Sequence, residues 1–344
     1  MLKWTPPKGL GLACGALFFC ASLAAGELPA YSPAAPVSGT LTCAGADTMH
    51  DLAESWARGF RDFHPDATVR VRRDGKFAAD GLEAVMSGEA QCALFVREPF
   101  PAEAAKFRSK FGYEPTLVNV AGGSHATKSA THAIAIFVNA ANPIRGLTLA
   151  ELDAIFAKAR RRGAKEITTW GQLGLGGEWA ERPIRVYGML RRRETANPPG
   201  IVNFLEQRVL LGGEFRDDVR EESGTPAEPA LDAIVRRVAE DAAGIGYSGF
   251  AYARPGARTV PIAREPQGPY YAGRPEEIAA REYPLSREIY LAVNRVPGKP
   301  VEPLTREFLL YALSRDGQRA VAADRMKFTP LDGAQAASAR ERLR

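Results

Sequence analysis

The sequence is poor in the residues that most often carry metal or redox chemistry, with only four cysteines and four histidines among 344 residues. The histidines are not at metal-ligand spacing with one another or with the cysteines. No serine lies in a Gly-x-Ser-x-Gly elbow. The glycines between residues 171 and 177 form neither a dinucleotide fingerprint nor a P-loop. The sequence therefore predicts no enzyme activity, no bound metal and no cofactor.

Long apolar runs are also scarce. The run from Leu10 to Leu23 is short for a membrane-spanning helix, and it follows Lys3 and Lys8. Together with a cleavage-compatible Ser22-Leu-Ala, this pattern predicts that residues 1–25 are an export signal, which places the mature protein in the periplasm. Lipidation at the cysteine of Leu-Phe-Phe-Cys is the alternative, but the bulky preceding residues disfavour it. No later run could insert the mature chain into a membrane.

Cysteine and net charge narrow the class of protein further. Cys43 and Cys92 remain once the signal is removed, and they could form a disulfide in an oxidising compartment or be two small buried apolar side chains. Removing Lys3 and Lys8 lowers the formal net charge from +5 to +3. This mild excess favours neither a nucleic acid nor an anionic membrane as partner.

The most informative stretch runs from Gly39 to Trp56. Residues 39–43 read as a strand, residues 44–47 as a turn of small residues, and the apolar spacing that follows predicts a helix with Leu52, Trp56, Phe60 and Phe63 on its buried face. Asp47 or Thr48 would cap that helix, and Thr48 with Asp51 has the capping-box spacing. A strand that turns into a helix exposes free N–H groups, which is a general anion site as well as an ordinary structural feature.

Strand-like and helix-like segments alternate along the rest of the chain, which predicts an α/β fold. We expect strands at residues 67–72, 91–96, 132–138, 184–187, 244–249 and 289–294, and helices at residues 82–87, 102–111, 149–159, 200–211, 230–239 and 305–314.

A series of short motifs occurs along this framework. They are Ala46-Asp-Thr-Met, Val96-Arg, Ala141-Asn-Pro-Ile, Thr169-Trp-Gly-Gln-Leu-Gly, Tyr187-Gly, Gly244-Ile-Gly-Tyr-Ser-Gly, Tyr283-Pro-Leu-Ser-Arg and Leu313-Ser-Arg-Asp-Gly-Gln. In their order and spacing, over roughly residues 39–331, the motifs resemble those of periplasmic solute-binding proteins of the phosphate-binding type. The chain is identified as a member of that family.

The resemblance implies a monomeric two-lobed α/β clamp whose hinge consists of two crossover strands. Residues 26–38 would be a loose leader, residues 39–134 with 290–334 lobe 1, residues 135–289 lobe 2, and residues 335–344 a mobile tail. Such a clamp would capture phosphate or a related small oxyanion between its lobes, for an ABC importer. Binding by fixed N–H groups, hydroxyls and one or two arginines suits a desolvated oxyanion.

The resemblance also supplies candidate ligand contacts in lobe 1. Ala46, Asp47 and Thr48 match the family's first ligand segment, although Thr48 could merely cap its helix. Arg97 matches the family's Ser-Arg arginine, with Val96 in place of the serine; it could instead form a salt bridge with Glu98 at the rim. Lobe 1 departs from the family at a turn and at one further position. Ala78 and Ala79, with Phe77, stand in the turn that usually offers serine hydroxyls. His132 replaces an aspartate and could donate to an anion or be a satisfied half-buried histidine.

The second lobe departs further from the family. Met189 replaces an arginine, and Pro198-Pro-Gly replaces a Ser-Gly-Thr helix cap. Arg191 or Arg192, with Thr195 nearby, could supply the missing charge, or this loop could be a solvated basic segment. Because an apolar jaw would not offset the desolvation of a dianion, the alternative is a clamp-fold protein that no longer transports and serves as a sensor or interaction scaffold.

Overall fold

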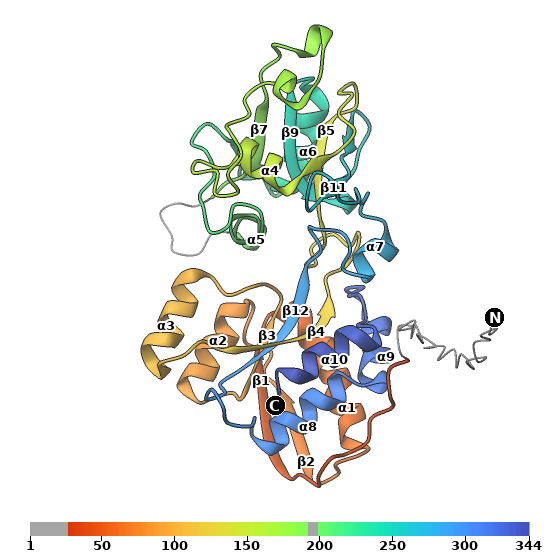
Figure 1. The fold of residues 1–344 in the computed structure, drawn as a ribbon. Coiled ribbons are helices and arrows are strands. Elements are labelled where there is room, and N and C mark those ends of the chain that lie inside the picture. The colour runs from red at the N-terminus through yellow and green to blue at the C-terminus, as the bar shows by residue number, and fades with distance from the viewer. Residues whose placement is uncertain (1–26, 192–198, 344) are drawn as a thin grey trace, which may run out of the picture.

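A computed structural model describes residues 27–191 and 199–343. The predicted export signal, residues 1–25, and the candidates Arg192 and Thr195 therefore lie outside the described residues. Two separate five-stranded sheets make up the framework, and Figure 1 shows them as two lobes joined by a narrow connection.

The lobe 1 sheet has the strand order β2-β1-β3-β12-β4. Its strands are β1 (Gly39–Gly45), β2 (Ala67–Val71), β3 (Cys92–Phe95), β4 (Thr116–Gly122) and β12 (Glu288–Val293). β1 pairs in parallel with β2 and β3, whereas β12 runs antiparallel between β3 and β4. A strand from the end of the chain thus lies inside a sheet built mainly by its beginning.

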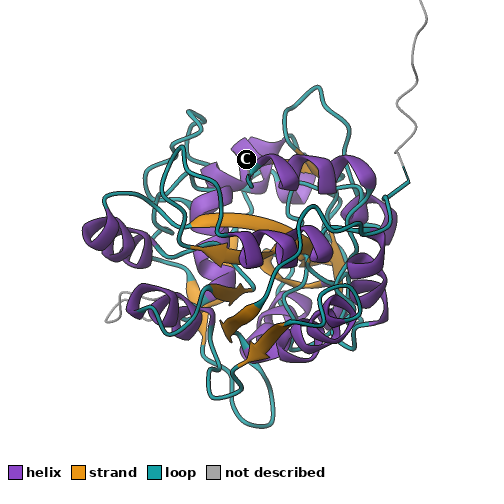
Figure 2. Cartoon of the chain, turned by 90° about the horizontal axis from the view of Figure 1, so that it is seen from below, coloured by secondary structure: helices purple, strands orange, loops and turns teal. Residues whose placement is uncertain are grey.

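Helices cover both faces of the lobe 1 sheet, as the view from below in Figure 2 also shows. One face packs against α1 (His50–Arg61), α8 (Pro303–Ala312), α9 (Arg315–Ala323) and α10 (Gly333–Glu341), around Trp56 and Phe308. The other face packs against α2 (Ala78–Ser87) and α3 (Pro101–Phe111), around Leu82 and Phe107. The buried parallel strands are nearly all apolar because both faces are covered.

The lobe 2 sheet has the strand order β10-β5-β9-β7-β8. Its strands are β5 (Ile134–Asn139), β7 (Arg185–Met189), β8 (Arg220–Glu222), β9 (Gly244–Gly249) and β10 (Ala257–Thr259). A small sheet pairs β6 (Leu147–Thr148) with β11 (Ile262–Ala263). The lobe 2 helices are α4 (Leu149–Phe156), α5 (Gly200–Arg208), α6 (Ala230–Glu240) and α7 (Pro275–Ala279). Short 3-10 helices in the described part of the chain are Asp47–Met49, Trp170–Leu173, Gly177–Trp179 and Phe250–Tyr252.

The chain crosses between the sheets twice. It leaves β4 of lobe 1 for β5 of lobe 2, and it returns from α7 to β12 (Figure 1). The predicted α/β clamp with two crossover strands is therefore confirmed.

Both ends of lobe 1 are better ordered than the sequence predicted. Residues 27–38 of the predicted loose leader contain no helix or strand, but Tyr31 attaches them to lobe 1: it is only 7% exposed, and its hydroxyl contacts His64 and donates to Glu307. The expected mobile tail at 335–344 is wrong, since α10 covers β4 and Leu343 is buried in the lobe 1 core. Alanine-rich polar segments such as α10 have little apolar periodicity, which hides them from a pattern search.

The first turn after β1 also differs in detail. A 3-10 helix begins at Asp47, α1 begins at His50, and neither start has a side-chain cap, so the predicted capping box of Thr48 and Asp51 is wrong. Phe63 is 41% exposed because α1 has already ended at Arg61.

The two cysteines are buried partners in the sheet. Cys43 on β1 lies in register with Cys92 on β3, and both thiols are free and fully buried. Hydrogen bonding with Cys43 and burial raise the pKa of the Cys92 thiol. Of the two alternatives that the sequence left open, the structure has the pair of small buried side chains.

Candidate functional site: the cleft between the lobes

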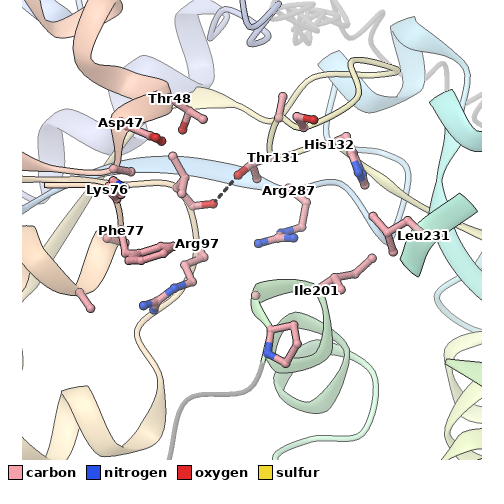
Figure 3. A pocket seen from close by; sticks show the side chains of 18 of the residues that line it. Asp47, Thr48, Lys76, Phe77, Arg97, Thr131, His132, Ile201, Leu231 and Arg287 are labelled. Atoms are coloured by element: carbon pink, nitrogen blue, oxygen red, sulfur yellow. Dashed lines mark hydrogen bonds between the residues drawn. The ribbon is translucent and has the colours of Figure 1, made fainter. Parts of the chain in front are cut away.

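A cleft of about 800 Å³ separates the lobes and is lined by both of them (Figure 3). Lobe 1 contributes the turn after β1, the start of α2 and the loop after β3. The two crossings contribute residues 129–132 and Arg287, and lobe 2 contributes Met189, residues 199–201 and Leu231. The cleft thus lies where the helix starts of lobe 1 face the start of α5.

The predicted contacts at residues 46–48 do line the cleft, but two of their amides are already used. The Ala46 N–H donates to the Leu94 carbonyl at 3.1 Å, and the Asp47 N–H donates to the Lys76 carbonyl at 3.3 Å. The Thr48 hydroxyl has no hydrogen-bond partner among the described residues. Thr48 is therefore the group of this turn that is most available to a ligand.

The start of α2 forms the neighbouring part of the wall. Ala78 and Ala79 occupy its first turn, whose N–H groups have no carbonyl partner within the helix. The Asp80 carboxylate accepts from the N–H groups of Lys76 and Phe77 at 2.8 and 2.9 Å. The helix begins four residues earlier than predicted, because Asp80 caps a segment whose glycines suggested a turn.

Arg97 lines the cleft, but its charge is already neutralised. Its guanidinium donates twice to the Glu103 carboxylate, at 2.7 and 2.6 Å, and lies 3.5 Å from the centre of the Phe100 ring. It also donates to the backbone carbonyl of Glu98. The sequence left a rim salt bridge with Glu98 open as an alternative to a ligand contact; the ion pair forms with Glu103 instead, and both side chains are about nine-tenths buried.

His132 lies on the crossing from β4 to β5 and also lines the cleft. Its ring is buried against Gly249 and Tyr252, and its Nδ1 atom is 3.2 Å from the Ala133 carbonyl. Burial and the positive charge of Arg287 lower the pKa of His132. His132 is therefore neutral at pH 7 and is not a cationic anchor for an anion.

Arg287 is a buried cation of the cleft that the sequence analysis missed, and the exposed Lys76 on the lobe 1 wall is another lining cation that it did not name. The Arg287 side chain is only 5% exposed, yet it projects into the cleft above the start of α5 (Figure 3). Its Nε–H is buried without a partner, and its guanidinium lies 4.7 Å from the centre of the Phe204 ring. A sequence signal that could have identified Arg287 is its place at the end of the motif Tyr283-Pro-Leu-Ser-Arg, just before the predicted last strand.

The lobe 2 wall is apolar among the described residues. Met189, Ile201 and Leu231 face the cleft, and α5 begins at Gly200 after Pro199 without a side-chain cap. No lysine, arginine, serine or threonine of residues 27–191 or 199–343 lines the cleft from this lobe. The first-turn amides of α5 are the polar groups that this wall offers.

The structure does not bring Arg191 to the cleft. Its buried guanidinium donates to Glu221 and to the carbonyl groups of Phe215 and Arg216, at 3.1 and 3.0 Å for the two carbonyls. These three acceptors hold Arg191 inside lobe 2, so the prediction that it faces a ligand is corrected. Arg192 and Thr195 lie outside the described residues.

Glu206 makes the stability of lobe 2 depend on pH. Burial and the nearby Glu214 carboxylate raise the pKa of Glu206, on α5, to about 7, despite the opposing charge of Arg191. Because the pKa of Glu206 is higher in the folded state than in the unfolded state, the folded state binds this proton more tightly. The stabilisation from protonated Glu206 is complete below the unfolded pKa and is lost as the pH rises through the folded pKa of about 7. We expect Glu206 to lower the free energy of unfolding by roughly 1–3 kcal/mol between pH 5 and 8.

Urea unfolding at several pH values would measure this effect. Glu206→Gln should flatten the decline in the free energy of unfolding across this pH range, whereas Glu181→Gln, at an exposed position, should leave it unchanged. Equal slopes for the wild type and Glu206→Gln would contradict the assignment.

The described residues contain no cluster of metal-ligating side chains. Within residues 27–191 and 199–343, no helix has the length and hydropathy to span a membrane.

Comparison with known proteins places the chain in a family. A model described as a PBP superfamily domain matches residues 30–316. Phosphate-binding protein PstS of Pseudomonas aeruginosa is 34% identical over 298 residues, which cover 86% of this chain and 85% of the relative.

Two crystal structures are similar in fold. PstS from Borrelia burgdorferi aligns with a TM-score of 0.54 and 15% identity, over 86% of this chain and 99% of that one. An ABC-type phosphate transport receptor from Vibrio cholerae aligns with a TM-score of 0.50 and 18% identity, over 85% of this chain and all of the other. At these identities the solved structures show the fold alone, whereas the family match and the Pseudomonas relative each span most of the sequence. The chain therefore belongs to the PBP superfamily and, within it, to the family of the phosphate-binding protein PstS.

Proposed function

We propose that the protein captures phosphate, or a closely related small oxyanion, by closing its two lobes around it. The observation that carries this proposal is the 34% identity to a phosphate-binding protein over 86% of the chain. The cleft supports it, because helix starts from both lobes face one space and a hinge of two crossings would let the lobes close. Closure would remove water and strengthen each hydrogen bond to the ion.

In this proposal, lobe 1 binds the anion with neutral donors. The Thr48 hydroxyl and the first-turn amides of Ala78 and Ala79 would donate to its oxygens, because helix starts favour negative charge. Neutral His132 offers one donor or acceptor at the base of the cleft. Arg97 contributes by holding the loop after β3 in place.

The first-turn amides of α5 would close over the anion from lobe 2. Arg192 and Thr195 remain candidate contacts from this lobe, since they directly precede the segment that lines the cleft. The binding step needs no covalent chemistry.

Export and delivery complete the proposal. The pattern of residues 1–25 supports export to the periplasm, where the mature chain would deliver its ligand to an ABC permease.

Isothermal titration calorimetry and thermal unfolding of the mature chain, starting at residue 27, would test the proposal. We expect one saturable site for phosphate and for arsenate, with melting temperatures that rise with ligand concentration. A ligand at 100 times its dissociation constant stabilises the fold by about 2.7 kcal/mol. No heat and no thermal shift with phosphate, arsenate or sulfate would contradict the proposal.

The second candidate is a sensor or scaffold that keeps the clamp fold without ligand capture. The apolar wall of Met189, Ile201 and Leu231 favours it, because carbon atoms cannot replace the hydration of an oxyanion. A mature protein that responds to none of the three anions would support this candidate.

A further inference from the structure

Arg287 is a buried cation with no counter-charge in contact. It lies on the return crossing, one residue before β12, and its side chain is only 5% exposed. No hydrogen bond or ion pair of its guanidinium occurs within the described residues, and its Nε–H is fully buried without a partner. The Phe204 ring, at 4.7 Å, covers one face of the guanidinium but accepts none of its N–H groups.

Other buried arginines of this protein have partners. Arg97 is held by Glu103, and Arg191 is held by Glu221 and two carbonyl groups. A buried charge without a partner is costly, and structures rarely keep one without compensation. Arg287 lies on the wall of the cleft, and its two Nη atoms, unlike Nε, are not fully buried and have no partner among the described residues, so a bound molecule could reach them.

We propose that Arg287 supplies the positive charge that neutralises the captured oxyanion, so that the missing partner of its guanidinium is the ligand itself. This inference rests on the proposed function and names the residue that sets its charge selectivity. The planar guanidinium can donate two parallel N–H groups to two oxygens of a tetrahedral or carboxylate anion. The cleft then has a buried cation at the hinge, beside a lobe 1 wall that carries the exposed Lys76 and the paired Arg97, and a lobe 2 wall that is apolar among the described residues.

The place of Arg287 on a crossing has a mechanical consequence. An anion bound to the hinge lies at the base of the cleft, where both lobes can close over it without moving its charged contact away. The Phe204 ring, on α5, would hold the guanidinium plane against lobe 2 while lobe 1 supplies the Thr48 hydroxyl. One cation on the hinge can thus serve both jaws.

Glu98 is the competing partner from within the protein. Its Oε2 atom is buried without a hydrogen bond, and its Oε1 atom lies 3.5 Å from the Tyr290 hydroxyl. Glu98 and Arg287 are not within ion-pair distance. If Glu98 were the partner that holds Arg287 in the native fold, removal of the arginine would destabilise the ligand-free protein. The melting temperature of the ligand-free variant therefore separates the two interpretations, because only a partnership with Glu98 predicts that it falls.

The test compares Arg287→Met with a matched control, Arg258→Met. Arg258 is a partly buried arginine of lobe 2 that donates to the Asn142 carbonyl at 3.1 and 2.6 Å and does not line the cleft. In calorimetry with inorganic phosphate, we expect Arg287→Met to weaken affinity about 10- to 100-fold, as for a lost hydrogen bond to a charged group. Its ligand-free melting temperature should be unchanged or higher. Arg258→Met should lower the melting temperature and keep the affinity.

Arg287→Lys provides a second readout. Lysine keeps the charge but loses the paired donors, so we expect an affinity between those of the wild type and Arg287→Met. Unchanged phosphate affinity in Arg287→Met would overturn the inference while leaving the proposed function intact. An Arg287→Met protein that melts earlier or does not fold would also overturn it, because the guanidinium would then have a partner within the protein. A wild-type protein without phosphate binding would instead refute the proposed function.

Discussion

Replacing Glu103 with glutamine is expected to lower the free energy of unfolding by about 3–5 kcal/mol, because it leaves a buried guanidinium without its counter-charge. The side chains of Arg97 and Glu103 are only 9% and 11% exposed, and two hydrogen bonds of 2.7 and 2.6 Å join them. The same carboxylate also accepts from the Phe100 N–H at the start of α3. Urea unfolding of the mature chain would measure the loss.

Glu83→Gln is the matched control for this prediction. Glu83 pairs with Lys106 on the surface, where both side chains are more than half exposed. Exposed pairs contribute about 0–1 kcal/mol, so this variant should stay close to the wild type. Equal losses in the two variants would show that the Arg97–Glu103 pair is not the buried contact described above.

A methyl group at Gly45 should destabilise lobe 1 by about 3 kcal/mol and displace the turn that lines the cleft. Gly45 has a φ of +134°, which L side chains rarely adopt, and an added Cβ would lie 2.6 Å from the Leu94 carbonyl oxygen and 3.3 Å from the Gly81 Cα. These are backbone atoms, which cannot rotate away. We expect Gly45→Ala to lose stability in urea and to bind phosphate more weakly in calorimetry.

Gly39→Ala is the control that distinguishes the effect of backbone strain from the effect of the close contact, since Gly39 lies at the other end of β1. Gly39 also has a positive φ, +102°, but an added Cβ would meet nothing within 4 Å. Gly39→Ala should therefore show the strain alone, with a smaller loss of stability and unchanged phosphate affinity. If Gly39→Ala were as destabilised as Gly45→Ala, the close packing of β1 on β3 and α2 would not be what positions the turn.

Much of the fold could be predicted because its strands are short apolar runs that end in small residues. The strand and helix around Gly39–Trp56 are where the sequence placed them, and α/β alternation predicted the two sheets. β4 was missed because Asn119 interrupts its apolar pattern, and α10 was missed because it is rich in alanine and polar residues. β4 forms a strand because it pairs with β12, which lies far along the chain, and this tertiary pairing is not visible in the local sequence.

The cleft was only partly predictable, because sequence position does not reveal which charges are already paired. Thr48, Arg97 and His132, which the resemblance placed at one ligand site, all line the cleft. Thr48 and Arg97 follow the parallel strands β1 and β3, whereas His132 precedes β5. The partners Glu103 and Glu221, which occupy Arg97 and Arg191, depend on side-chain directions that no local pattern gives. Arg287 was missed for the converse reason, because the absence of a partner is visible only in three dimensions.

The central claim is that phosphate is held between two lobes that close on it. Spin labels at Ser109→Cys on α3 and Gln207→Cys on α5 would report the distance across the cleft, since these exposed positions lie on opposite lobes (Figure 1) and the native Cys43 and Cys92 are buried. Pulsed dipolar spectroscopy should show a shorter distance when saturating phosphate is added. A distance that phosphate leaves unchanged would contradict the account.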